Sequence, residues 1–370
     1  MRDPRIQQLA QRLIRYSVNL QKGEKILIDI YDHADDFAVA LVEAAYEAGG
    51  IPFVNQESNT IKRALLMNAT KEQMDALFKY ELLRMQDMNA YIAVRKSNNI
   101  TELSDVPEDK MNLYNEFYGR LHLEHRVKHT KWCVLRYPSS SMAQQAGMST
   151  EAFEDYYFAV CGLDYEKLRE LMLPLKELMD KTDRVRIVAK DTDLEFSIKG
   201  RESGICCGKA NIPDGEICLA PIKESVNGTI TYNVPSNFHG FTYQNISFTF
   251  KDGKIVRATA NDTERINKVL DIDPGARYIG EFAIGVNPYM DRHITDTLFD
   301  EKMTGSIHFT PGSGGDNVSS IHWDIIQCHT PAYGGGSIYF DGKLIRKDGL
   351  FTDEALSGLN PENFKKSIRI

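Results

Sequence analysis

Two short segments in the last third of the chain place histidines where strand alternation would expose them together. In SIHFT, a strand would turn Phe309 to one side and His308 to the other. In SSIHWDII, Trp323 separates His322 from Asp324, so the histidine and the aspartate would share one side of a strand. An imidazole and a carboxylate that point to one spot can bind a divalent ion. The spacing alone leaves a purely structural role open.

Three glutamates interrupt stretches that otherwise look apolar or tightly turned. Glu281 lies in the glycine-bounded segment IGEFAIG, Glu216 follows the Pro-Asp-Gly turn of NIPDGEICLAP, and Glu301 lies in LFDEK. A buried carboxylate needs a metal ion or a cationic partner, because an unpaired one costs several kcal/mol. The spacing does not choose between a metal and a salt bridge. Glu301 is the least distinctive, since an exposed helix or loop glutamate would look the same.

Other groups of reactive side chains are interpreted as structural. The segment HLEHRVKH resembles a zinc-binding helix in its histidine spacing, but its Arg126 and Lys128 would repel a cation. Neighbouring thiols and imidazoles in sequence rarely align for nucleophilic catalysis, and no nucleophile-elbow pattern surrounds the serine run. The residues concerned are His122, His125, His129, Cys206, Cys207, Cys328, His329 and Ser139 to Ser141.

Length and composition restrict the class of protein. A chain of 370 residues is long enough for two or three domains. The formal net charge of −8 gives nucleic acid no broad electrostatic reason to bind. The six cysteines form no disulfide pattern, the first residues lack the apolar core of a signal peptide, and no long apolar run occurs. We therefore expect a cytoplasmic protein without a membrane partner or a nucleic-acid partner.

The first half of the chain alternates between helical and strand-like patterns. A βαβ arrangement is expected, because a helix that ends at Gly49-Gly50 separates two short apolar strands. Such a unit implies a parallel sheet with helices packed against it. The predicted helices cover residues 5–18 and 35–48, and the predicted strands cover 25–30, 51–54, 90–94 and 132–135. The sequence therefore predicts an α/β amino-terminal domain with a mostly parallel sheet.

A strongly helical region, 149–180, precedes a change of pattern near Thr182, and Pro174 is expected to kink or divide that region. Beyond Thr182, short alternating strands flank turn signals such as Lys251-Asp252-Gly253, with a helix near residues 262–270. The predicted strands cover 184–189, 194–198, 246–250, 255–260, 336–340 and 343–346. We thus expect domains at residues 1–182 and 183–370, the second being α+β and mostly antiparallel.

Five motifs in order carry a resemblance to a known family. PDGE, GEFAIG, LFDEK, the following IH and IHWD resemble the catalytic domain of the thermophilic metalloprotease family, the aminopeptidase T and aminopeptidase S type of metallo-aminopeptidase. GEKILIDI, the helix ending in AGG and KWCVLRYPSSSMAQQAGMS are similar to the amino-terminal domain of that family. The resemblance covers almost the whole chain. The metal ligands that it implies are Glu216, Glu281, Glu301, His308, His322 and Asp324.

The resemblance implies a cytoplasmic homodimer that hydrolyses the N-terminal peptide bond of peptides with a free N-terminus. Two divalent ions, Zn²⁺, Co²⁺ or Mn²⁺, would activate a water molecule and stabilise the tetrahedral intermediate. Glu281 is the candidate for bridging the ions or contacting the water. A metal-dependent hydrolase of another amide, or a non-catalytic ligand-binding relative, remains the alternative.

The chain departs from the family pattern near the expected site, where a tyrosine is missing and the loop to His322 is shortened. HFTPGSGG has a glycine, near Gly315, where the family usually carries a tyrosine, which would weaken stabilisation of the oxyanion. Tyr289 and Tyr333 are the candidates to replace it.

Overall fold

The computed structural model describes residues 3–367, which form two compact units. The first unit contains residues up to Gly162 together with the short segment Gly208–Pro213. The second contains Leu163–Cys207 and the chain from Asp214 onward. The second unit begins just before a long helix, residues 165–181, and this helix packs against strands of the second unit. The predicted domain boundary near Thr182 would instead assign this helix to the first domain, and that boundary stays a prediction.

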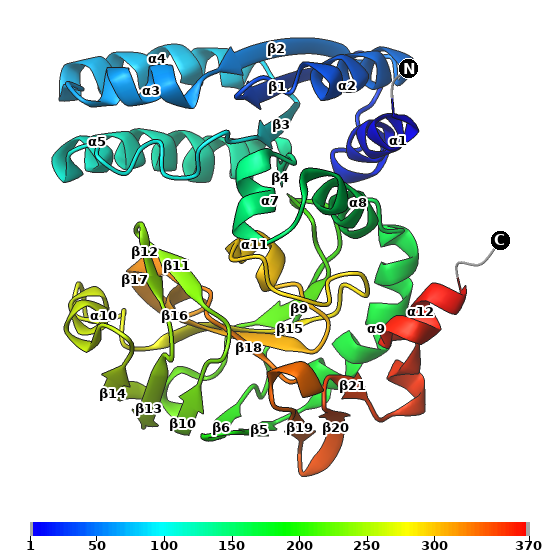
Figure 1. Cartoon of the computed structure of the whole chain (residues 1–370), viewed down its shortest axis with the longest axis vertical. Helices are drawn as coiled ribbons and strands as arrows, with labels where there is room; N and C mark the ends of the chain where they lie inside the picture. Colours follow the sequence, from blue (N-terminus) through cyan, green and yellow to red (C-terminus); the bar gives the residue numbers. More distant parts are fainter. Residues whose placement is uncertain (1–2, 368–370) are drawn as a thin grey trace. The chain divides into compact units, whose positions relative to one another are not determined.

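A five-stranded sheet with only parallel pairs forms the centre of the first unit (Figure 1). Its order is β2-β1-β3-β4-β8, so a crossover connection links each strand to the next along the chain. The strands are β1 (Lys25–Tyr31), β2 (Ile51–Glu57), β3 (Ala90–Arg95), β4 (Lys131–Arg136) and β8 (Asn211–Ile212). The predicted parallel sheet of the amino-terminal half is confirmed, with strand bounds close to those expected.

Helices precede and connect these strands, and several begin at Ser or Thr caps. The Ser58 side chain accepts a hydrogen bond from the Ile61 amide, and the Thr70 side chain accepts one from the Gln73 amide. The helices are α1 (Pro4–Arg12), a π-helical turn (Leu13–Ser17), α2 (Asp35–Glu47), α3 (Asn59–Leu66), α4 (Lys71–Gln86), α5 (Glu108–Gly119), a second π-helical turn (Arg120–Arg126), α6 (Val127–His129), α7 (Ser140–Gln145) and α8 (Thr150–Cys161).

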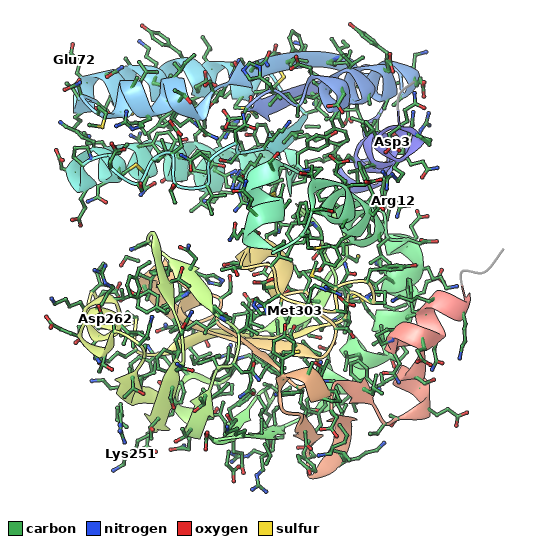
Figure 2. All side chains as sticks on the ribbon, in the orientation of Figure 1. Asp3, Arg12, Glu72, Lys251, Asp262 and Met303 are labelled. Carbon is green, nitrogen blue, oxygen red and sulfur yellow. The ribbon has the colours of Figure 1, made fainter. Side chains whose placement is uncertain are left out.

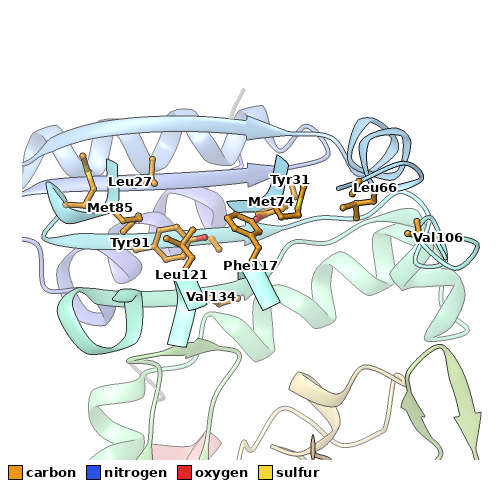
Figure 3. Packing of buried hydrophobic residues seen from close by; sticks show 13 residues of the cluster. Leu27, Tyr31, Leu66, Met74, Met85, Tyr91, Val106, Phe117, Leu121 and Val134 are labelled. Atoms are coloured by element: carbon orange, nitrogen blue, oxygen red, sulfur yellow. The ribbon is translucent and has the colours of Figure 1, made fainter. Parts of the chain in front are cut away.

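One buried cluster joins the parallel sheet to the helices that follow it (Figure 3). Strands β1 and β3 contribute Leu27 and Tyr91, while α4 and α5 contribute Met85 and Phe117. Burial of such side chains stabilises the folded state by about 25 cal/mol for each Å² of apolar area removed from water. This core anchors the helical segment that runs from α3 to α5, for which the sequence patterns gave no specific expectation.

Two antiparallel sheets build the second unit. The larger has the order β14-β13-β10-β6-β5-β19-β20-β21, and the smaller has the order β17-β16-β15-β9-β7, with β18 also paired to β16. The strands of the larger sheet are β5 (Arg184–Ala189), β6 (Thr192–Ser197), β10 (Asn227–Thr231), β13 (Ser247–Lys251), β14 (Lys254–Thr259), β19 (Gly336–Phe340), β20 (Lys343–Lys347) and β21 (Leu350–Phe351). The expected α+β, mostly antiparallel second half is confirmed.

The smaller sheet is the element that matters for the candidate site. It contains β7 (Gly204–Cys206), β9 (Glu216–Leu219), β15 (Ile279–Gly285), β16 (Ser306–Gly314), β17 (Asn317–His322) and β18 (Ile326–Cys328). The remaining elements are the hairpin β11 (Ser236–Phe238) with β12 (Phe241–Tyr243), and the helices α9 (Tyr165–Lys181), α10 (Thr263–Leu270), α11 (Thr297–Asp300) and α12 (Pro361–Ser367), together with short 3₁₀ turns.

Aromatic side chains join the two sheets through one face of the smaller sheet. Phe196 on β6 lies with its ring 5.0 Å from the rings of both Phe282 on β15 and Phe309 on β16, measured between centroids. Because strand side chains alternate, the neighbours of Phe282 and Phe309 along the chain point to the opposite face. Glu281 and His308 are therefore turned away from the aromatic core.

Local predictions differ from the structure at Pro174 and at the first turn of the second half. Pro174 lies inside α9, which continues without interruption, and the helical region is divided instead near Gly162. The turn predicted at Asp191–Asp193 is shorter in the structure, so strand β6 already begins at Thr192. Asp191 adopts a φ of 52° in this turn. Among residues 3–367, no helix has both the length and the apolar character that a membrane crossing needs.

Candidate metal centre

The register of the smaller sheet brings polar residues from successive strands to one face. Cross-strand neighbours share a face in an antiparallel pair. Glu281 of β15 is opposite Thr310 of β16, and His308 is opposite Ala283, two residues further along β15. On the other side of β15, Gly285 is opposite Glu216 of β9. Glu216, Glu281 and His308 therefore point to the same face, and their ligand atoms lie within 4.8 Å of one another.

Two glycines that bound β15 let neighbouring backbone come close to this face. A Cβ on Gly280 would lie 2.5 Å from the carbonyl oxygen of Gly312, and one on Gly285 would lie 2.8 Å from the carbonyl oxygen of Glu301. Since real side chains do not tolerate such contacts, only glycine fits at both positions. The IGEFAIG pattern thus has a structural cause: it permits the segment around Glu301 to pack against the strand that carries Glu281.

His322 and Asp324 complete the cluster from the end of β17. Nε2 of His322 lies 3.1 Å from Oδ1 of Asp324 and 3.9 Å from Oε2 of Glu281. Between them, Trp323 is buried on the opposite side, where its indole donates to the Ser236 hydroxyl at 2.8 Å. The buried indole fixes the orientation of both neighbours. The predicted alternation around Trp323 is what the structure contains.

Each of the two residues is also held by a partner behind it. Nδ1 of His322 lies 2.7 Å from the carbonyl oxygen of Ser313, which can only accept, so Nδ1 carries the proton and Nε2 is free for a ligand role. The Thr310 hydroxyl donates to Oδ1 of Asp324 at 2.8 Å. Such outer partners are typical of side chains that bind a metal ion.

His308 lies at the centre of the cluster and is 1% exposed. Its Nε2 is 3.1 Å from Oε1 of Glu281 and 4.0 Å from Oδ1 of Asp324. Four ligands about 2.1 Å from a zinc ion in tetrahedral geometry are roughly 3.4 Å apart. The four histidine–carboxylate separations among His308, His322, Asp324 and Glu281 run from 3.1 to 4.0 Å around that value, with a different oxygen of Glu281 near each histidine.

Two buried polar atoms in the cluster lack a hydrogen-bond partner, which also fits a cation site. They are Nδ1 of His308 and Oε2 of Glu216, which face each other at 3.6 Å. Orphaned buried polar atoms are costly, so each calls for a partner that the protein itself does not supply at hydrogen-bond distance. The donor set of imidazoles and carboxylates suits Zn²⁺, Mn²⁺ or Co²⁺. The assignment of all six residues as metal ligands stays a prediction.

Glu216 and Glu301 meet at a residue that the sequence patterns did not single out. The ammonium of Lys302 lies 2.6 Å from Oε1 of Glu216 and 2.6 Å from Oε1 of Glu301, and its side chain is 3% exposed. Met303, the next residue, lies in the interior of the second unit (Figure 2). No local pattern singles out Lys302, because a lysine beside acidic residues, as in LFDEK, is typical of an exposed segment.

The charges of the cluster shift its protonation equilibria. Burial opposes a charge on either histidine, but Glu216, Glu281 and Asp324 raise the pKa of His308 to about 10. Asp324 likewise raises the pKa of His322 to about 9 against the effect of burial. Although burial favours the neutral acid, the two histidines hold the pKa of Asp324 far below its usual value. Burial raises the pKa of Glu301 to about 8. Without a metal ion, both histidines are therefore protonated at neutral pH.

The other histidines make contacts of their own. The ring of His122 stacks on Tyr118, and the rings of His125 and His129 are 5.1 Å apart on the helical segment of the first unit. Nε2 of His329 lies 2.8 Å from the side-chain oxygen of Gln327. These contacts agree with the structural roles that the sequence favoured for the four histidines. Cys206 lies closer to the site, since ligand atoms of Cys206, Asp214 and Glu216 are within 4.8 Å of one another.

Two tyrosines were candidates to replace the expected family tyrosine, and each makes contacts elsewhere. The Tyr333 hydroxyl lies 2.7 Å from Nδ1 of His293. The Tyr289 ring packs edge-on against Phe364, with the ammonium of Lys365 over its face. Neither contact brings a phenol group to the cluster.

Comparison with known proteins gives a match over most of the chain. Residues 2–332 match the family model of the thermophilic metalloproteases (M29). Aminopeptidase AmpS of Bacillus subtilis (strain 168) is 24% identical over 342 residues, which is 82% of this chain and 83% of that protein.

Solved structures share the fold of this chain. Wild-type AmpT from Thermus thermophilus superimposes with a TM-score of 0.81 at 21% identity, over 95% of this chain and 99% of that one. The 2,5-dihydroxypyridine dioxygenase of Pseudomonas putida has a TM-score of 0.61 at 11% identity, over 95% of this chain and 98% of that one. Since proteins with different names share this fold, the function must be argued from the site.

Proposed function

Because the chain belongs to the thermophilic metalloprotease family (M29), we propose that it is a metal-dependent aminopeptidase acting on peptides with a free N-terminus. The observation that carries the proposal is the cluster of His308, His322, Asp324 and Glu281, in which each histidine lies 3.1 to 4.0 Å from both carboxylates. The aminopeptidases among its relatives support the choice of substrate.

We propose that these four residues hold the ion. A divalent ion bound there would lower the pKa of a water molecule and polarise the scissile carbonyl group. Glu281, His322 and Asp324 are the partly exposed members, with side-chain exposures of 25%, 42% and 18%, so substrate reaches the cluster from their side. Glu281 can take the proton of the attacking water, because, although burial opposes its charge, the hydrogen bond with His308 lowers the pKa of this carboxyl group.

The carboxylates also provide the anchor that an aminopeptidase needs for the substrate's α-ammonium group. Four acidic side chains converge here, and a positively charged amine can pair with whichever of them is not occupied by a cation. An acetyl cap removes both the charge and the donors, leaving the acidic group unpaired. Such a mismatch costs about 10⁴-fold in kcat/KM in sites built for a hydrogen-bonded substrate group.

The predicted second ion requires Glu216 and Glu301 as ligands. One oxygen of each carboxylate contacts the ammonium of Lys302, so a second ion would compete with that ammonium for these two oxygens. The number of ions is therefore a separate proposal from the activity itself.

The cytoplasmic location and the homodimer are also proposed on the family resemblance. Edge strand β2 carries Ile51, Phe53 and Val54 with exposures of 43%, 42% and 49%, and apolar edge strands commonly pair with another chain. Sedimentation velocity on the purified protein tests the dimer, and a single monomeric species at high concentration would contradict it.

Mass spectrometry of a free decapeptide and of its N-acetylated twin tests the activity. We expect the metal-loaded protein to shorten the free peptide one residue at a time from its N-terminus and to leave the acetylated peptide intact. His322→Ala, prepared in parallel, controls for contaminating peptidases and should produce no ladder. Internal cuts, or equal cleavage of both peptides, would contradict the proposal. Metal binding without cleavage of either peptide would favour a hydrolase of another amide.

A further inference from the structure

Lys302 is a buried cation that contacts two carboxylates of the candidate site. It lies two residues after the end of α11, and its backbone is held by hydrogen bonds from the Asn287 amide to its carbonyl and from its own amide to the Phe299 carbonyl. Its residue exposure is 2%. A fully buried lysine is rare unless it is paired, and this one has two carboxylate partners at 2.6 Å.

The ammonium occupies one oxygen of each of the two carboxylates that a second metal ion would need. Glu216 and Glu301 come from separate segments, the start of β9 and the residue after α11, and they converge on this one atom. A separation of 2.6 Å from both oxygens resembles the ligand distance of a large divalent ion with oxygen ligands. An ion and the ammonium could not both bind these oxygens, because their charges would repel each other at contact distance.

Because Glu216 contacts Lys302, it can position His308 instead of binding a second ion. Oε1 of Glu216 binds Lys302, while its Oε2 faces Nδ1 of His308 at 3.6 Å. A small inward movement would let Nδ1 of His308 donate to Oε2 and leave Nε2 for the ion. A carboxylate behind a metal-binding histidine is a common arrangement that fixes the imidazole tautomer.

We propose that Lys302 is the permanent second cation of this site, so that the protein binds one divalent ion per chain, between His308, His322, Asp324 and Glu281. Glu216 is then a positioning residue for His308. This inference rests on the proposed metal-dependent function and specifies its metal content.

The charge count supports a single ion. Above the raised pKa of Glu301, four carboxylates face one divalent ion and one ammonium, which leaves one negative charge that a substrate's α-ammonium group can neutralise. Two divalent ions beside Lys302 would instead give the site a net positive charge, which disfavours a cationic substrate group.

Metal content tests the proposal directly. The whole protein is stripped with chelator, loaded with Mn²⁺ or Zn²⁺, freed of unbound ions by gel filtration and analysed by elemental mass spectrometry. We expect one ion per chain in the unaltered protein and two in Lys302→Met, whose similar length fills the space without the charge. Lys343→Met, which removes an exposed lysine paired with Asp353, is the matched control and should keep one ion.

Electron paramagnetic resonance of the Mn²⁺-loaded protein provides a second measurement that does not depend on the variant's folding. A single bound Mn²⁺ gives the signal of an isolated ion, whereas two ions about 3.5–4 Å apart give a spin-coupled signal. We expect the isolated signal in the unaltered protein and the coupled signal in Lys302→Met.

The results separate this inference from the proposed function. Two bound ions or a coupled signal in the unaltered protein, together with metal-dependent peptide cleavage, would overturn the inference and leave the function standing. Folded Lys302→Met that still binds one ion would also overturn the role of Lys302. No binding of either metal would overturn the inference and the metal-dependent function together.

Discussion

Oδ1 of Asp324 lies 3.1 Å from Nε2 of His322, although the two residues are separated by a tryptophan that points the other way. The pair is therefore not a flexible surface contact. Its geometry is set by the buried indole of Trp323 between the two residues and by the hydrogen bonds from Thr310 to Asp324 and from His322 to Ser313.

Thr310→Val should weaken metal binding without unfolding the protein. The substitution keeps the shape of the side chain but removes the 2.8 Å hydrogen bond to Oδ1 of Asp324. Loss of such an outer partner typically costs 10–100-fold in metal affinity, and we expect a decrease of about that size. Competition with a chromophoric chelator measures it. Thr229→Val, which removes a hydroxyl from the larger sheet, is the control and should retain the original affinity.

His322→Ala or Asp324→Ala should lose the bound ion and most of the activity. Each substitution removes a ligand atom from a group of four and leaves the others too few for tight binding. Elemental analysis and the rate on an aminoacyl chromogenic substrate measure the two effects. His125→Ala and His129→Ala are the matched controls, since their rings lie on a helical segment of the first unit. If those controls lost the ion and the cluster variants kept it, the metal centre would lie elsewhere.

Removal of the ion should abolish hydrolysis reversibly. Prolonged dialysis against a chelator is expected to give an inactive but folded protein, because the fold rests on two buried cores that contain no metal ligand. Zn²⁺, Co²⁺ or Mn²⁺ should each restore activity, since mixed imidazole and carboxylate ligands discriminate weakly among them. Circular dichroism checks the fold and the chromogenic assay checks the rate. Full activity in excess chelator would refute metal dependence.

Metal binding should release protons at neutral pH. The neighbouring carboxylates raise the pKa of His308 to about 10 and that of His322 to about 9, so both are protonated before the ion arrives. Only neutral imidazoles bind a metal, so the apparent affinity should increase with pH until these values are reached. Titration calorimetry in buffers of different ionisation enthalpy counts the protons. A pH-independent affinity with no proton release would show that both imidazoles are neutral beforehand.

The same pKa shifts predict a stability trend for the protein without metal. Both histidines have a higher pKa in the folded state than the ordinary value of 6.5. Their contribution to the free energy of unfolding is therefore complete below about pH 6.5 and is lost as the pH rises through about 9 to 10. Thermal unfolding in chelator should show this decrease, and His322→Ala should show a smaller one. If the difference in melting temperature between the unaltered protein and His322→Ala stayed constant over this pH range, the trend would be contradicted.

The sequence by itself determined the candidate cluster and the fold class. Strand alternation is a local rule with a period of two, so the positions of His308, His322 and Asp324 relative to their apolar neighbours could be predicted without knowing what the strands pack against. The glycine-bounded segment IGEFAIG marked Glu281 as an unusual position for a charge, whereas the close backbone approach at its glycines is seen only in the structure. The order of the motifs carried the family resemblance, and the match of residues 2–332 confirmed it.

Only the tertiary structure decided which carboxylates face one another and which cation they face. The register of β9, β15 and β16 places Glu216 beside His308, although many residues separate them in the chain. Lys302 looked like an ordinary surface lysine because its sequence neighbours include two acidic residues. Its burial depends on how the segment after α11 packs against Gly285, a long-range contact that no local pattern encodes. A charge is stabilised by whatever surrounds it in space, so the partners of Lys302 emerge only when distant strands are brought together.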